Sequence, residues 1–108
     1  MIYLISYDLK TKNKDYSGLY EVIRNCGEWI HPLESLWIVD TRARNLRAEQ
    51  ITDLLRTNMT QDDTLFVCQV DSSDRNGWMV KSAWAWLRAH EEPRAAGQHG
   101  NIALQSEG

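Results

Sequence analysis

Three short segments of the sequence are apolar at odd and even positions alike, and this pattern restricts the possible folds more than any other. The segments are Ile2–Tyr7, Ser35–Val39 and Leu65–Val70. Each has the length of a β-strand, in which successive side chains point to opposite faces of a sheet. Helices that cover one face of such a sheet leave an apolar second face, which needs a further layer or a second copy of the chain.

Two helical periodicities separate these strands. Tyr16, Leu19, Tyr20 and Ile23 recur at helical spacing, and Gly27 marks the helix end. A second helix is expected after Asn45, whose side chain makes it a favourable N-cap.

One more strand is expected at Glu28–His31, joined to the next through Pro32. The resulting order, β-α-β-β-α-β, predicts an α+β, ferredoxin-like domain with a four-stranded antiparallel sheet. In that topology the strands lie in the order 4-1-3-2. A Trp-rich segment from Trp78 to about His90 predicts a third helix. Residues 1–90 would then form a single domain, and residues 91–108, with little apolar content, a loose tail.

Composition narrows the class of protein. No segment approaches the ~20 apolar residues of a membrane span, and no secretory signal is apparent. Cys26 and Cys68 fit free thiols of a cytoplasmic protein rather than a disulfide or zinc site. The net charge of −3 predicts that nucleic acid could bind only through a local cationic patch.

Polar residues are expected to gather at one edge of the predicted sheet. This topology brings together the end of the first strand and the starts of the third and fourth. The carboxylate and hydroxyl residues at these points are Asp8, Glu34, Ser35, Asp62 and Asp63, and the adjoining loop carries Lys10, Lys12 and Lys14. Carboxylates for a divalent cation and lysines for phosphate are the groups that metal-assisted phosphodiester cleavage requires.

Structural interpretations of the same residues stay open. An aspartate at a strand end often forms a turn, and Asp62–Asp63 also fits a turn before a strand. The three lysines fit a solvated loop. His31 fits a hairpin residue as well as a general base.

The segment Ile2–Asp8 resembles the opening strand of the CRISPR-associated Cas-two family, which ends in Tyr-Asp. Cys26-Gly27, Ser35-Leu36-Trp37 and Asp62-Asp63 resemble further features of that family in the same order. The same core is shared by VapD-type ribonuclease toxins and by small bacterial proteins labelled SinR-like, whose endings are similar to residues 77–88.

This resemblance implies a homodimer, with Asp8 as a catalytic carboxylate that binds Mg²⁺ or Mn²⁺ near the dimer axis. The chain departs from the Cas-two pattern at Tyr16–Leu19, where the family has arginines. It also has a Trp-rich segment in place of the family's exchanged fifth strand.

Two functions remain possible at this point. The first is a dimeric, Mg²⁺-dependent nuclease acting on RNA or DNA, of a toxin or defence type. The alternative is a non-catalytic dimeric scaffold that binds nucleic acid or a protein partner, such as an antitoxin or an integrase subunit. The lysine loop beside Asp8 favours the nuclease, whereas the acidic net charge favours the scaffold.

Overall fold

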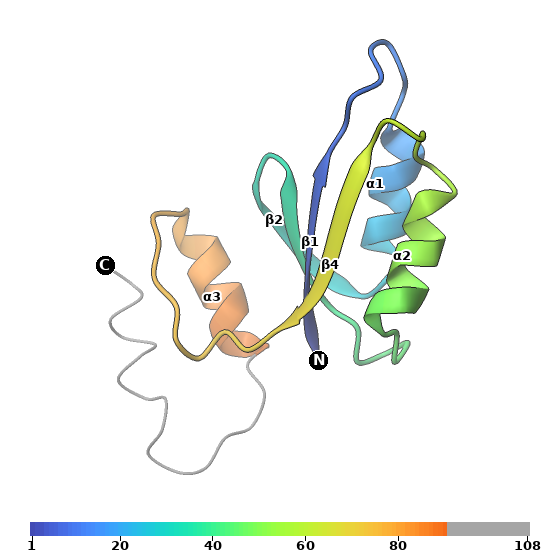
Figure 1. Ribbon diagram of the computed structural model, residues 1–108. Coiled ribbons are helices and arrows are strands. Elements are labelled where there is room, and N and C mark those ends of the chain that lie inside the picture. Colours follow the sequence, from blue (N-terminus) through green and yellow to red (C-terminus); the bar gives the residue numbers. More distant parts are fainter. Residues whose placement is uncertain (91–108) are drawn as a thin grey trace. The chain divides into compact units, whose positions relative to one another are not determined.

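The computed structural model describes residues 1–90, whose helices and strands are shown in Figure 1. The chain divides into two compact units, Met1–Val70 and Asp71–Gly108. The first unit is fully described, and the second is described over residues 71–90. The expected loose tail, residues 91–108, lies outside the described residues.

The first unit is built on an open, four-stranded antiparallel sheet, which confirms the predicted α+β class. The strands are β1 (Ile2–Asp8), β2 (Glu28–Leu33), β3 (Leu36–Asp40) and β4 (Thr64–Val70). They lie in the order β2-β3-β1-β4. The helices α1 (Ser17–Arg24) and α2 (Ala48–Arg56) lie on the same side of this sheet (Figure 1).

The face of the sheet beneath the helices forms the core of the first unit. Tyr3, Ile5 and Tyr7 alternate along β1 and are buried. They pack with residues of β3, of both helices and of the turn after α1: Leu19, Ile23, Cys26, Trp37, Val39, Ile51 and Leu55. Each helix contributes residues four positions apart, because that spacing returns to one face of an α-helix.

The second face of the sheet is also apolar. Leu4 lies opposite Ile38 of β3 and opposite Cys68 of β4. One step further along, Ser6 lies between Leu36 and Phe66. Phe66 is 62% exposed, although a phenylalanine is among the residues that gain most from burial.

The start of α2 and the end of β2 differ from the sequence-based expectations. Asn45 is not an N-cap, because its φ of 52° is left-handed and α2 begins only at Ala48. Instead, the Gln50 side chain accepts a hydrogen bond from the N–H of Arg47 at 2.8 Å. Pro32 lies within β2 rather than after it, which is possible because β2 is an edge strand.

Gly27 connects α1 to β2 at a point where the backbone of β3 passes very close. Its φ is 159°, and a Cβ atom placed on it would lie 2.0 Å from the carbonyl oxygen of Asp40. No side chain fits in that space, so the turn into β2 requires glycine.

The second unit contains α3 (Lys81–Ala89), which begins at Lys81 rather than at Trp78. Ala83, Trp84 and Leu87 form the buried side of this helix. Trp78 precedes the helix and is 94% exposed. Within residues 1–90, no helix has both the length and the apolar character that a membrane crossing requires.

Candidate functional site

Asp8 is the last residue of β1 and lies opposite Thr64 of β4. Its side chain is 64% exposed, and its carboxylate lies 3.1 Å from Nζ of Lys10. In the described part of the chain, no backbone N–H donates to this carboxylate, as one would in a turn. The carboxylate is therefore accessible to a ligand from solvent.

Asp63 directly precedes β4, next to the Thr64 that lies opposite Asp8, and it has a structural role. The side chain is buried and accepts hydrogen bonds from the N–H groups of Lys10 and Thr60, both at 2.8 Å. The Tyr16 hydroxyl donates to the same carboxylate at 2.8 Å. Burial alone would raise the pKa of Asp63, but these hydrogen bonds outweigh it and lower the pKa to about 2.

Replacing Asp63 with asparagine is expected to destabilise the protein by about 2 kcal/mol, because an amide cannot accept all of these hydrogen bonds. For a chain of this size the melting temperature should fall by about 10 °C, measurable by thermal unfolding. The stabilisation from Asp63 is complete above its unfolded-state pKa of 3.8 and is lost as the pH falls through about 2. The variant should therefore lose less stability than wild type between those pH values. An equal loss in both proteins would contradict this role.

Glu34 and Ser35 join this edge through their backbone. The Ser35 carbonyl accepts a hydrogen bond from the N–H of Tyr7 at 3.1 Å. The Glu34 carbonyl accepts one from the Tyr7 hydroxyl at 3.4 Å and one from Nε2 of His31 at 2.9 Å. The turn between β2 and β3 is thus attached to the end of β1 by main-chain atoms.

An aromatic network supports the same turn. The Trp37 indole N–H donates to the Tyr7 hydroxyl at 3.0 Å, and the His31 ring stacks on Trp37 with centroids 3.9 Å apart. Burial raises the pKa of Tyr7, against the effect of the Trp37 hydrogen bond. The phenol is therefore neutral at physiological pH and can donate to Glu34.

The remaining predicted residues do not converge on Asp8. Lys12 and Lys14 are exposed in the loop after β1, and Nζ of Lys14 lies 5.3 Å from the centre of the Tyr16 ring. Asp62 is exposed next to Asp63. The structure thus connects Asp8 and Asp63 only through Lys10, whose Nζ contacts Asp8 and whose backbone N–H donates to Asp63. Lys12, Lys14 and Asp62 are exposed.

The donor set limits what a metal could use here. Within residues 1–90, no group of three or more His, Cys, Asp or Glu side chains is arranged to hold a metal ion. Asp63 is occupied by its hydrogen bonds, so Asp8 is the carboxylate that a cation could reach. Mg²⁺ keeps several waters and takes one or two carboxylates from the protein, so Asp8 can supply one of these ligands.

The roles of Tyr16 and Trp37 could not be predicted from the sequence. The helical periodicity predicts only that Tyr16 packs with the apolar face of a helix, yet its hydroxyl donates to a carboxylate 47 positions away. No local pattern identifies such a pair, although a tyrosine or tryptophan in an apolar segment usually needs a partner for its polar atom.

Comparison with known proteins adds no relative. A scan against models of protein families finds no match, and a search of curated proteins finds none either.

Proposed function

We propose that the protein is a homodimeric, Mg²⁺-dependent nuclease in which Asp8 of each copy binds the metal. The observation that carries this proposal is the exposure of the Asp8 carboxylate at the end of a central strand. Among the described residues, its one polar contact is with the side chain of Lys10.

A metal near the dimer axis would draw on both copies of the chain. One Asp8 supplies one carboxylate, and a two-fold axis near the end of β1 would supply the second. Mg²⁺ bound there would polarise a phosphoryl oxygen and lower the pKa of a bound water. Lys10 would move from Asp8 to a phosphate oxygen of RNA or DNA, because the metal replaces it as the counter-charge.

The fold that accompanies this proposal is the ferredoxin-like arrangement, and the dimer would form through the second face of the sheet. Leu4, Leu36, Ile38, Phe66 and Cys68 lie on that face. About 800 Å² per partner is a standard interface, and an exposed phenylalanine is a suitable centre for it. A cytoplasmic protein of toxin or defence type fits this proposal.

Phe66→Asp is expected to weaken the dimer about 100-fold or more, because each copy loses an apolar contact and gains a buried charge. Light scattering across a micromolar concentration series measures this change. Gln69→Asp is the matched control, because Gln69 is an exposed residue of the same strand on the other face. Wild-type protein of monomeric mass throughout, or equal weakening by both substitutions, would contradict the interface.

Nuclease activity is tested by incubating the wild-type protein with labelled single- and double-stranded RNA and DNA. Mg²⁺ and Mn²⁺ should support cleavage, and EDTA should abolish it. Mn²⁺ should also raise the melting temperature, because a ligand that binds only the folded state stabilises it. A protein without activity or metal stabilisation would contradict the proposal.

The second candidate is a non-catalytic dimeric scaffold that binds nucleic acid or a protein partner. It is favoured by the Lys10–Asp8 ion pair, which neutralises the carboxylate without a metal. A stable dimer that binds nucleic acid equally well in Mg²⁺ and in EDTA, without cleaving it, would establish the scaffold.

A further inference from the structure

A group of arginines lies at the opposite end of the sheet from Asp8. Arg24 is the last residue of α1, and Arg44 lies in the loop after β3. Nη1 of Arg44 donates to the backbone carbonyl of Asn25 at 2.9 Å. This hydrogen bond holds Arg44 beside the residue that follows Arg24, so two guanidinium groups from distant parts of the sequence come to the same end of the unit.

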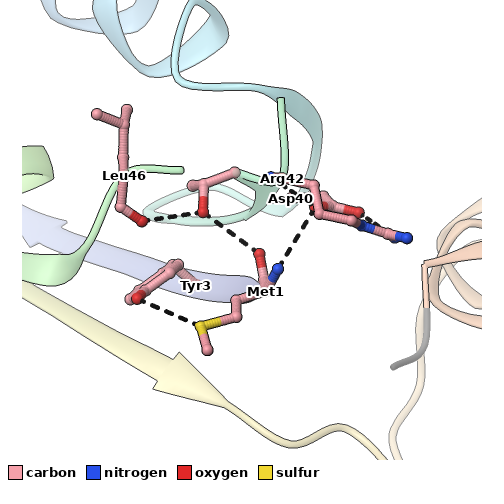
Figure 2. A network of polar contacts seen from close by, with 6 residues as sticks. Met1, Tyr3, Asp40, Arg42 and Leu46 are labelled. Atoms are coloured by element: carbon pink, nitrogen blue, oxygen red, sulfur yellow. Dashed lines mark hydrogen bonds and ion pairs between the residues drawn. The ribbon is translucent and has the colours of Figure 1, made fainter. Parts of the chain in front are cut away.

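The arginines bring several guanidinium groups to one end of an acidic protein. Residues 41–50 contain three arginines and one glutamate, whereas the whole chain has a net charge of −3. Arg42 is neutralised by Asp40, at 2.7 Å, in the network shown in Figure 2. In the described part of the chain no carboxylate pairs with Arg24, Arg44 or Arg47, and all three are exposed.

An exposed indole lies at the same end. Trp29 is the second residue of β2 and follows Arg24 by only five positions, across the turn at Gly27. It is 40% exposed, and its ring centre lies 5.1 Å from that of the buried Trp37. Trp37 is held in turn by its hydrogen bond to Tyr7 and by the His31 ring. Trp29 therefore packs against a fixed aromatic ring, while part of its own surface is exposed to solvent.

We propose that Arg24, Trp29 and Arg44, here called the arginine–tryptophan surface, bind single-stranded nucleic acid. Guanidinium groups recognise phosphate in a planar, bidentate manner. An indole stacks on any nucleobase that is free of a duplex, and this pairing of cations with an aromatic platform is how single strands are bound without sequence preference. An acidic protein would use the arginines equally well, but it would gain less from the exposed indole.

This surface is distinct from the proposed nuclease site. Glu28 and Ile2 lie opposite Asp40, so the starts of β1 and β2 share this end of the sheet with the end of β3. Asp8 closes β1 at the other end. Binding here would position a strand on the protein whether or not Asp8 holds a metal.

The test is fluorescence anisotropy of a labelled twelve-nucleotide oligo-dT, in EDTA and at low salt, with the full chain. The double variant Arg24→Gln/Arg44→Gln should lose at least about 10-fold in affinity. Its salt dependence should weaken by about 1.4 in the log–log slope, from two lost phosphate contacts. Lys12→Gln/Lys14→Gln removes the same charge from the other end of the sheet and should change the affinity less than about 2-fold.

The indole is tested separately. Trp29→Ala should lose about 10-fold in affinity, whereas Trp29→Phe should retain most of it, because phenylalanine still offers a ring to a base. A melting temperature within a few degrees of wild type shows that each variant is folded. Because binding is measured in EDTA, its outcome does not depend on a metal at Asp8, which separates this proposal from the nuclease site.

Three outcomes would overturn the proposal. They are no binding by the wild-type protein at low salt, equal losses in the arginine and lysine variants, and unchanged affinity in Trp29→Ala. Preferential binding of an acidic peptide over oligo-dT would assign the surface to a protein partner instead.

Discussion

Replacing Asp8 with asparagine is expected to reduce metal-dependent cleavage of nucleic acid by about 100-fold or more. That is the scale on which enzymes lose activity when a principal electrostatic contributor to catalysis is removed. Asparagine keeps the size of the side chain but removes the charge that binds Mg²⁺. Initial rates under saturating Mg²⁺ and Mn²⁺ measure the effect, and the stabilisation of the protein by Mn²⁺ should disappear in parallel.

The matched control for this experiment is Asp62→Asn. Asp62 is also an exposed acidic residue at this edge of the sheet, but it lies in the turn before β4 rather than at the end of a strand. Its substitution should leave the rate within about 2-fold of wild type. Folding should be nearly unaffected in both variants, because the Lys10–Asp8 ion pair is solvent-exposed and such pairs stabilise a fold little. Full activity in Asp8→Asn, or equal losses in both variants, would exclude Asp8 as a metal ligand.

Gly27→Ala is expected to destabilise the protein by about 3–4 kcal/mol, a large effect for the addition of one methyl group. The new Cβ would meet the Asp40 carbonyl oxygen at 2.0 Å, and this oxygen belongs to a strand within the sheet. Relief of the overlap requires β2 and β3 to move apart, with the loss of packing between them. Urea unfolding should show a lower midpoint with an unchanged slope.

Gly77→Ala provides the comparison, because a Cβ at Gly77 would lie 3.5 Å from the Trp84 ring, an ordinary contact distance. That variant should stay within about 0.5 kcal/mol of wild type, as surface substitutions usually do. A Gly27→Ala variant as stable as Gly77→Ala would contradict the close approach of Gly27 to β3.

The sheet could be predicted from sequence because strand signals are local. Short apolar runs bounded by polar and turn residues located all four strands to within about two residues, including the short ones around Pro32. The start of α2 could not be predicted in the same way. The side chain of Asn45 is suited to an N-cap, but an asparagine also tolerates a left-handed backbone, which it adopts here. Which of the two an asparagine adopts depends on the path of the whole loop.

The candidate site was predictable only as a set of positions. The topology placed Asp8, Asp63 and Ser35 at a common edge, because strand ends are fixed once the strand order is known. What each side chain does there depends on contacts between residues distant in sequence. The neighbours of Asp63 in the sequence indicate a turn residue. Burial raises the pKa of Asp63 and the nearby Thr60 lowers it, but Lys10 and Tyr16, 53 and 47 positions away, lower it further through hydrogen bonds.

The strand order also determines when the sheet can be completed. β1 is synthesised first, but both of its partners come later, β3 at Leu36 and β4 at Thr64. The β2–β3 pair is a hairpin that closes over a short distance, whereas joining β1 to β4 closes a loop of more than fifty residues. During translation, the central strand β1 therefore stays without its second neighbour until Val70 has left the ribosome.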